Sequence, residues 1–273
     1  MKTILITGST DGIGKQTALE LAQLGNRIII HGRDINRCID VRNHIKAISG
    51  NKYIDFIAAD LSSMKAVRSM AEEIKNNYKK LDVLINNAGV FERKKKITAD
   101  GFERTFAVNH LSVFLLTGLL YDLIKNSAPA RIITVSSMAH ASEIDFDNLQ
   151  GEKHYDGHDA YSRSKLCNIL FTFELAKRLN HNGVTANCLH PGVISTKLLH
   201  AGWGMGGASL ESGAQTSVYL AAAEELEDVT GKYFSNKRES KPAAICNDTN
   251  VRKKLWEISE SLCGITFDCK GKL

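Results

Sequence analysis

The stretch TILITGSTDGIG, residues 3–14, decides the fold. Residues 3–7 are β-branched or apolar on both faces, which is typical of a strand buried in a parallel sheet. Glycines in a GxxxGxG spacing then precede a predicted helix over residues 13–24. A tight turn there lets the backbone approach a phosphate, and the helix N-terminus offers free N–H groups. The stretch therefore predicts a nucleotide-binding turn formed by Gly8, Ser9, Thr10, Asp11, Gly12, Ile13 and Gly14.

The rest of the chain repeats this alternation of short apolar strands and longer helices. Such alternation implies parallel strand pairing through right-handed crossovers, with helices on both faces of the sheet. We expect an α/β fold, a single doubly wound domain over residues 1–273 with an about seven-stranded parallel sheet. A glycine-rich segment around residues 197–212 is predicted to be a substrate lid, or else a surface loop. Further strands are predicted over residues 27–31, 53–58, 83–85, 131–135, 184–189 and 232–234, and helices over 35–48, 63–78, 102–124, 160–179, 212–223 and 251–262.

Composition excludes several classes of protein. The 273 residues carry a net charge of +5, and 43% of them are hydrophobic, so the chain is not disordered and nothing indicates a nucleic-acid partner. Six cysteines form no CxxC pair, and the histidines have no metal-ligand spacing, which predicts a reduced, cytoplasmic protein without a metal. The most apolar run, Leu111 to Tyr121, is interrupted and too short for a membrane span, and the N-terminus lacks the pattern of a signal peptide.

The second predicted strand ends at His31-Gly32-Arg33-Asp34, where the choice between NAD(H) and NADP(H) is made. An acidic residue at this point favours the free ribose hydroxyl of NAD, whereas an arginine accommodates the 2′-phosphate of NADP. Arg33 comes first and Arg37 is near, so we predict that NADP(H) is preferred, with NAD(H) as the alternative. Both charges could also be ordinary loop residues, with Asp34 capping the following helix.

Three further strand ends supply candidate cofactor contacts. Asp60-Leu61 follows the third strand, where a carboxylate could accept from the adenine amino group or could simply cap a turn. Small residues after the fourth strand, Asn87, Ala88 and Gly89, would let the backbone approach the adenosine ribose. After the sixth strand, the turn PGVIST is predicted to hold the nicotinamide carboxamide through Pro191, Gly192, Val193 and Thr196.

Tyr161 and Lys165 are the predicted acid–base pair. A tyrosine is a poor proton donor near neutral pH, and a lysine one helical turn away stabilises its phenolate. The chain has three Tyr/Lys pairs at this spacing, but Tyr121 falls late in a predicted helix, nearer the opposite rim, and Tyr233 lies in a short predicted strand and not in a helix. Tyr161 opens a helix at that rim, beside Ser137, which could donate to the substrate oxygen.

Asn109 lies within the long predicted helix over residues 102–124, where asparagine is unfavourable because it competes for the backbone. Its presence there would make sense if it bent the helix and held a water that relays protons to Lys165. The alternative is a buried asparagine with all its hydrogen bonds made inside the protein.

Taken together, these motifs resemble those of the short-chain dehydrogenases/reductases, which have a Rossmann fold. They occur in the family's order over most of the chain: TGSTDGIG (7–14), DL (60–61), NNAG (86–89), Asn109, Ser137, YSRSK (161–165) and PGVIST (191–196). The resemblance implies that Tyr161 is the general acid/base, that Lys165 binds the nicotinamide ribose and lowers the Tyr161 pKa, that Ser137 orients the carbonyl and that Asn109 holds the relay water.

Within that family, the chain is most similar to the retinol dehydrogenase-like reductases. Stretches such as residues 100–120 and 160–179 carry this similarity, which implies reduction of lipophilic aldehydes or ketones. We therefore expect an NADP(H)-dependent oxidoreductase acting on a small-molecule carbonyl or alcohol, as a homodimer or homotetramer without a membrane span. The alternative is a non-catalytic dinucleotide-binding sensor or scaffold, although such a protein need not keep Ser137, Tyr161 and Lys165 together.

Overall fold

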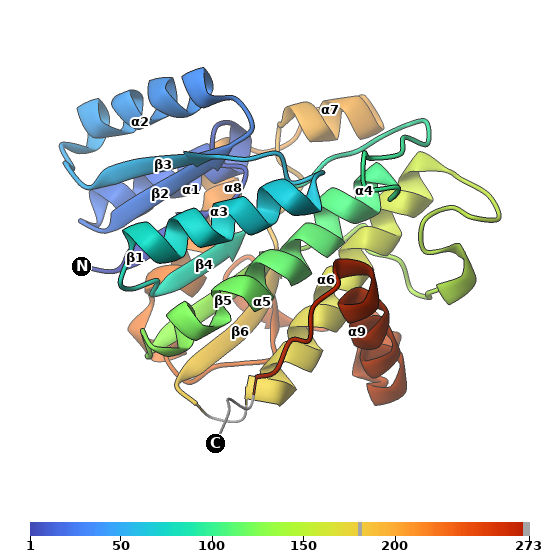
Figure 1. Ribbon diagram of the computed structural model, residues 1–273. Coiled ribbons are helices and arrows are strands. Elements are labelled where there is room, and N and C mark those ends of the chain that lie inside the picture. The colour runs from blue at the N-terminus through green and yellow to red at the C-terminus, as the bar shows by residue number, and fades with distance from the viewer. Residues whose placement is uncertain (180–181, 270–273) are drawn as a thin grey trace.

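The computed structural model describes residues 1–179 and 182–269. Their strands form one sheet of order β3-β2-β1-β4-β5-β6-β7-β8, in which all neighbours are parallel except β7 and β8 (Figure 1). The predicted parallel sheet is therefore confirmed, with one short antiparallel strand added at its edge. The strands are β1 (Thr3–Ile6), β2 (Arg27–Gly32), β3 (Ile54–Ala58), β4 (Val83–Asn86), β5 (Ala130–Val135), β6 (Val184–His190), β7 (Tyr233–Ser235) and β8 (Arg238–Ser240).

Helices cover both faces of this sheet. Residues of α1, α2 and α8 share one buried cluster, and residues of α3, α5, α6 and α9 share the other. In Figure 1, α3, α5 and α6 cross in front of the strands. The α-helices are α1 (Gly12–Gln23), α2 (Ile35–Ser49), α3 (Met64–Asn77), α4 (Arg104–Phe106), α5 (Ser112–Lys125), α6 (Gly157–Leu179), α7 (Lys197–Trp203), α8 (Leu210–Ala222) and α9 (Thr249–Cys263), with a π-helical turn η1 (Ala107–Leu111) and short 3-10 turns η2 (Phe146–Asn148), η3 (Glu224–Leu226) and η4 (Ala244–Asn247).

Side chains along each central strand alternate between the two clusters. In β1, Ile4 and Ile6 pack on the side of α1 and α8, whereas Leu5 packs on the side of α3 and α5. The same alternation runs through β2, β4 and β5. Because both faces are covered, the central residues of these strands are mostly apolar, which is why apolar runs in the sequence predicted them well.

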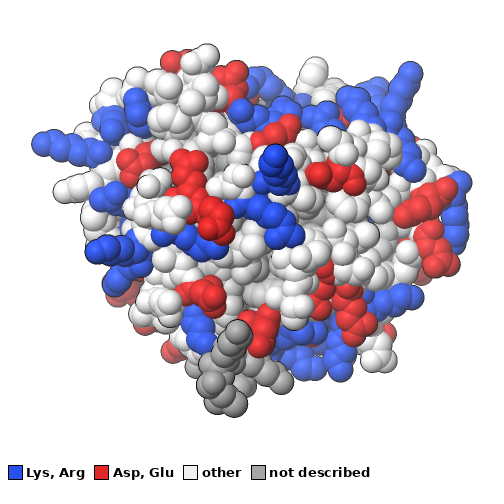
Figure 2. Space-filling model, in the orientation of Figure 1, with Lys and Arg blue, Asp and Glu red and all other residues white. Residues whose placement is uncertain are grey.

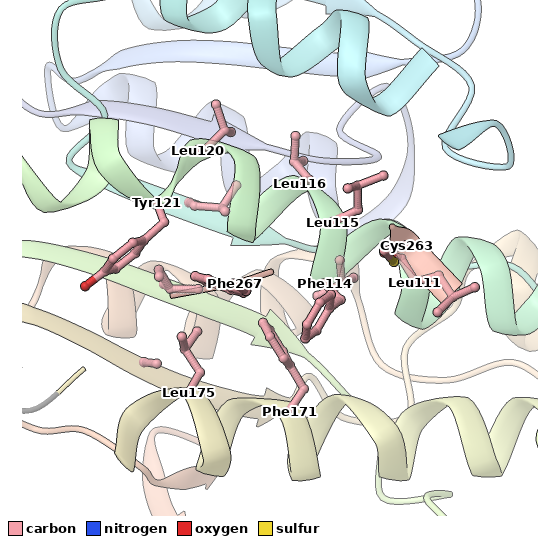
Figure 3. Close-up of a cluster of buried hydrophobic side chains, with 14 of the residues drawn as sticks. Leu111, Phe114, Leu115, Leu116, Leu120, Tyr121, Phe171, Leu175, Cys263 and Phe267 are labelled. Atoms are coloured by element: carbon pink, nitrogen blue, oxygen red, sulfur yellow. The ribbon is translucent and has the colours of Figure 1, made fainter. Parts of the chain in front are cut away.

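Aromatic rings join α5, α6 and the C-terminal segment in the larger cluster (Figure 3). The rings of Phe114 and Phe171 meet edge to face at 5.6 Å between centroids, and Phe114 lies 5.7 Å from Phe267. Trp256 of α9 stacks on Phe171 at 5.8 Å. Pairs of this geometry add to the energy of burial. They hold α6 firmly against α5, and α6 is the helix that carries Tyr161 and Lys165.

Three elements differ from the sequence prediction. The long helix over residues 102–124 is interrupted by η1, where the Ser112 N–H donates to the Ala107 carbonyl five residues back. The lid segment contains the helix α7 instead of a continuous loop. The edge strand β8 was not predicted, because its three residues are polar and follow a two-residue turn, Asn236-Lys237, in the left-handed region.

The helical stretch Arg104–Lys125 is long and apolar enough to cross a membrane by length and composition, with a mean hydropathy of 1.5. However, 78% of its most apolar window is buried inside the protein, as in the core helix of an α/β domain. No other helix within the described residues meets the same criteria. The expected absence of a membrane span therefore stays a prediction.

Strand order fixes where a ligand can lie. The chain runs outward from β1 to β3, then returns to add β4 on the other side of β1. The crossover connections therefore diverge at β1 and β4, and a crevice opens outside their carboxyl ends. The glycine turn after β1 and the segment after β4 both border this crevice.

Candidate active site

A cavity of about 840 Å³ lies at the carboxyl ends of the strands. Nearly all of the predicted site residues line it: Gly8, Thr10, Asp11, Gly12, Ile13, Gly14, Arg33, Asp60, Leu61, Asn87, Ala88, Gly89, Ser137, Tyr161, Lys165, Pro191, Gly192, Val193 and Thr196. The fold thus brings seven separate segments of the chain to one place, as the strand-end positions of these residues predicted.

Two predicted site residues are not among those that line the cavity. Ser9 is fully buried, and its hydroxyl donates to the Ile6 carbonyl and accepts from the His31 N–H. Its side chain therefore supports the turn from within and does not border the cavity, so its assignment as a cofactor contact stays a prediction. Asn109 is also fully buried.

The glycine turn fits closely against the segment after β4. Gly8 has a φ of +64°, and a Cβ atom added to it would lie 2.8 Å from the Ala88 Cα. A Cβ on Gly14 would lie 2.4 Å from the Asn87 Nδ2 and 2.5 Å from the Gly8 carbonyl oxygen. Only glycine fits at either position. The backbone surface thus left bare at the start of α1 is the cradle that a pyrophosphate requires.

Asn87 ties these two segments together. Its Nδ2 donates to the carbonyls of Thr7 and Gly8 at 2.8 and 3.1 Å, and its own N–H donates to the Thr7 hydroxyl at 2.9 Å. The Ala88 N–H donates to the same hydroxyl at 3.0 Å. Asn87 therefore positions the turn, and its side-chain amide is occupied by that task although the residue borders the cavity.

His31 is a residue of the site that sequence reasoning missed. It is 2% exposed, at the end of β2, and its Nδ1 accepts from the Gly8 N–H at 3.0 Å. Its Nε2 lies 3.1 Å from the Ala59 carbonyl, to which it must donate in that tautomer. Burial lowers the pKa of His31 to about 4, so the ring is neutral near pH 7. The polar residue at the end of an apolar strand was the available signal.

The structure separates the two charges after β2. Asp34 is the N-cap of α2 and accepts from the Arg37 N–H at 3.0 Å, so its carboxylate serves its own helix. Arg33 lines the cavity and makes no hydrogen bond or ion pair with any other residue that the structure describes. Of the two predicted readings of Asp34, the helix cap is the one observed.

Arg37 and Lys197 converge on Asp11, the N-cap of α1. The Asp11 carboxylate accepts from the Gly12 N–H and pairs with Arg37 at 3.2 Å and with Lys197 at 2.7 Å. The Lys197 hydrogen bond is the main cause that lowers the pKa of Asp11. These ion pairs connect α1, α2 and the lid helix α7 across the cavity mouth.

Asp60 lies at the cavity edge after β3, and its carboxylate also serves a local turn. Its Oδ1 accepts from both the N–H and the hydroxyl of Ser62, at 2.9 and 2.8 Å. The two interpretations offered by the sequence, cofactor contact and turn residue, are therefore compatible, since the residue borders the cavity and caps a turn at once.

Ser137, Tyr161 and Lys165 meet at the inner end of the cavity. Tyr161 and Lys165 are 6% and 3% exposed, and a side-chain hydrogen bond joins Ser137 to Tyr161. The Lys165 Nζ lies 5.6 Å from the centre of the Tyr161 ring and donates to the Val135 carbonyl at 3.0 Å. The other two Tyr/Lys pairs lie elsewhere: the Tyr121 hydroxyl donates to the Cys269 carbonyl, and Tyr233 is in β7.

Burial is the largest cause of the pKa shifts of Tyr161 and Lys165 in the protein alone. It raises the pKa of Tyr161 to about 12, against the opposing effect of the Ser137 hydrogen bond. It also lowers the pKa of Lys165 to about 8. Lowering of the Tyr161 pKa, which the family resemblance implies, therefore requires more charge stabilisation than Ser137 provides by itself.

Asn109 marks the π-helical turn η1. Its Oδ1 accepts from the Val90 N–H at 2.8 Å, and its Nδ2 donates to the Val90 carbonyl at 3.0 Å and to the Ser164 hydroxyl at 2.9 Å. Both sequence interpretations thus hold in part, because the helix is distorted and the side chain is fully bonded within the protein. The insertion of a π turn at a functional site is a common arrangement.

An aromatic wall stands beside Tyr161. Phe91 follows the NNAG segment, His158 begins α6 and Trp203 ends α7. The Trp203 ring lies 5.4 Å from the Tyr161 ring and 5.5 Å from Phe91, and Phe91 lies 6.1 Å from Tyr161. The predicted lid segment therefore delivers a large apolar ring to the reactive phenol.

Comparison with known proteins shows the family to which the chain belongs. The family model described as short chain dehydrogenase matches residues 2–203. The chain belongs to the short-chain dehydrogenase family. It is therefore a hydride-transfer oxidoreductase that acts on CH–OH or carbonyl groups of a small molecule with a nicotinamide dinucleotide cofactor.

This dehydrogenase is 44% identical to retinol dehydrogenase 13 of Homo sapiens, over 97% of this chain and 85% of that protein. Among solved structures, an uncharacterized protein from Mycobacterium paratuberculosis superimposes with a TM-score of 0.81 at 30% identity, covering 98% of this chain and 95% of that one. The Pseudomonas aeruginosa RhlG/NADP active-site complex superimposes with a TM-score of 0.71 at 26% identity, covering 85% and 93%. The expected similarity to retinol dehydrogenases is confirmed.

Among residues 1–179 and 182–269, no three or more His, Cys, Asp or Glu side chains are grouped as metal ligands. All six cysteines are free and buried. Over the face shown in Figure 2, acidic and basic side chains are intermingled, without a continuous basic stripe.

Proposed function

We propose that this dehydrogenase uses NADP(H) to interconvert a lipophilic aldehyde or ketone with its alcohol. The observation that carries the cofactor choice is Arg33, which borders the cavity and forms no hydrogen bond or ion pair with the described residues, whereas Asp34 caps α2. A guanidinium matches a phosphate group through paired hydrogen bonds. A solved neighbour in complex with NADP supports the same cofactor choice, and the retinol dehydrogenase relatives support a lipophilic alcohol or carbonyl substrate.

The residues present fit a dinucleotide. Gly8 and Gly14 leave the backbone of the first turn bare, as a pyrophosphate needs, and Arg33 faces the cavity at the end of β2. Lys165 lies at the other end, where it would hold the nicotinamide ribose. When bound, the nicotinamide ring supplies or accepts the hydride.

The protein's own groups move the proton. In the reductive direction the substrate carbon gains the hydride, and its oxygen gains a proton from Tyr161. The Ser137 hydroxyl, already bonded to Tyr161, orients the carbonyl oxygen toward the phenol. The Lys165 ammonium beside the ring stabilises the phenolate that remains. Apolar side chains of the lid, Leu199, Trp203 and Met205, border the cavity and suit an apolar substrate.

Two substitutions test this proposal. Tyr161→Phe removes the proton donor, so we expect turnover of an aldehyde panel with NADPH to fall at least about 100-fold while NADPH binding persists. Arg33→Ala should weaken NADPH binding about 10- to 100-fold and leave NADH binding nearly unchanged. A fully active Tyr161→Phe enzyme would refute the mechanism, and tighter binding of NADH than of NADPH by the unmodified enzyme would refute the cofactor choice. A protein that binds NADPH but reduces nothing in the panel would instead be the sensor.

A cytoplasmic location and a homodimer or homotetramer stay predictions. The six free thiols are compatible with a reducing compartment. Sedimentation of the purified protein with and without NADPH measures the oligomeric state directly.

A further inference from the structure

A second hollow of about 650 Å³ lies next to the active-site cavity. Met138 and the segment from His190 to Ile194 border both spaces. The far side of the second hollow is formed by the hairpin of β7 and β8 and ends at Lys241. We refer to this space as the Lys241 hollow.

The Lys241 hollow begins close to the reacting groups. His140, which lines it, comes three residues after Ser137, and the His140 N–H donates to the Ser137 carbonyl at 3.3 Å. The His140 ring meets Tyr233 of β7 edge to face at 5.9 Å. A substrate whose carbonyl lies at Ser137 and Tyr161 can therefore extend past Met138 into this space.

The chemistry of the lining favours an anion. Lys241 is the one charged side chain among the residues that line the hollow, and it forms no ion pair with any described residue. No Asp or Glu lines this space within the part of the chain that the structure describes. Its other polar groups are the hydroxyls of Ser212, Tyr233, Ser235 and Ser240, the Asn236 amide and the imidazoles of His140 and His190.

His190 supplies an independent observation. It is 7% exposed, and its Nδ1 is buried without a hydrogen-bond partner among the described residues. Burial and the neighbouring His140 lower the pKa of His190 to about 4, so it is a neutral ring at neutral pH. Buried polar atoms are nearly always bonded, which points to a ligand or water that completes this site.

We propose that the Lys241 hollow binds a carboxylate at the far end of the substrate. This inference rests on the proposed function and adds the substrate class: an aldehyde or ketone that carries a carboxylate several atoms from its carbonyl. One lysine surrounded by hydroxyl, amide and imidazole groups matches a single negative charge better than the double charge of a phosphate. The carboxylate does not react. The carbonyl carbon gains the hydride from NADPH and the oxygen gains the proton from Tyr161.

The test compares ω-oxo acids of increasing chain length with their methyl esters, using the full-length enzyme and NADPH. At the best length we expect the acid to have a KM at least about tenfold lower than its ester, with a similar kcat. Lys241→Met should remove this difference by raising the KM of the acid alone. The matched control is Lys237→Met, in the same hairpin but outside the lining of the hollow.

Unchanged kinetics with the ester show that the Lys241→Met protein is folded and active. Equal KM values for acid and ester at every length, or a preference for the acid that survives Lys241→Met, would overturn the assignment of the hollow and leave the proposed function intact. If the enzyme reduces neither series, the proposed function fails, and this inference fails with it.

Discussion

Protonation of His31 should make the stability of this protein depend on pH between about 4 and 6.5. The pKa of His31 falls from the ordinary 6.5 to about 4 on folding because the ring is buried. Between these values the unfolded chain binds the extra proton and the folded protein does not, so stability falls as the pH falls. The neutral ring is also needed for structure, since a protonated Nδ1 can no longer accept from the Gly8 N–H.

The size of the effect follows from the two pKa values. Between pH 7.5 and pH 5.0, the linkage relation gives a loss of about 2 kcal/mol in the free energy of unfolding from His31 alone. His31→Gln keeps an acceptor and a donor but does not titrate. Its free energy of unfolding should therefore fall by about 2 kcal/mol less than that of the unmodified protein over the same pH interval.

Urea unfolding at pH 7.5 and pH 5.0, followed by circular dichroism, measures this difference. The matched control is His44→Gln, at an exposed position on α2, which should change the pH dependence by less than about 0.5 kcal/mol. Comparing the two pH values removes any constant packing cost of the substitution. The reasoning is refuted if His31→Gln and the unmodified protein lose the same stability between these pH values.

Three other substitutions give distinct outcomes. Gly14→Ala places a methyl group 2.4 Å from the Asn87 Nδ2 and 2.5 Å from a backbone oxygen, so NADPH binding should be lost and Tm lowered. The control is Gly206→Ala, whose nearest contact would be 3.5 Å. Normal NADPH binding by the Gly14→Ala protein would contradict the close fit at Gly14. Asn109→Ala removes three hydrogen bonds, so the free energy of unfolding measured in urea should fall by about 2–4 kcal/mol and kcat should fall as well. An unchanged free energy of unfolding and an unchanged kcat would show that the π turn does not depend on Asn109. Asp11→Asn removes a negative charge beside the glycine turn but keeps the N-cap acceptor of α1. NADPH should therefore bind a few-fold more tightly at low salt, and the free energy of unfolding should change by less than about 1 kcal/mol. Weaker NADPH binding in a fluorescence titration would exclude this electrostatic effect.

Much of the site was predictable because it depends on strand ends. Parallel strands present their carboxyl ends at one edge, so residues that follow different strands meet without further information. Gly8, Asp60, Gly89, Ser137 and the turn after β6 were located in this way. The same rule separated Tyr161 from Tyr121, whereas Tyr233 was set aside because its segment was predicted to be a strand and not a helix.

Roles inside the site were less predictable, because they depend on which partner each polar group finds. Ser9 and Asn87 carry polar side chains typical of cofactor contacts, but close packing directs their hydrogen bonds to the backbone of neighbouring segments. Asp34 and Arg33 are adjacent in sequence, and only helix capping decided which of them stays free. The sequence pattern did not reveal the role of His31, because the hydrogen-bond partners of its ring, Gly8 and Ala59, lie 23 and 28 residues away in the chain.

The sequence by itself determined the doubly wound sheet, the nucleotide-binding turn and the Ser137, Tyr161 and Lys165 set, since apolar periodicity, glycine position and helical spacing are local properties of a chain. Tertiary structure alone decided the rest. It formed the α7 helix that brings Trp203 to Tyr161, and it placed the polar β8 hairpin so that Lys241 borders a hollow beside the active site. These contacts join residues far apart in the chain. Their energies come from burial and from contacts between distant segments, which a local sequence pattern cannot predict.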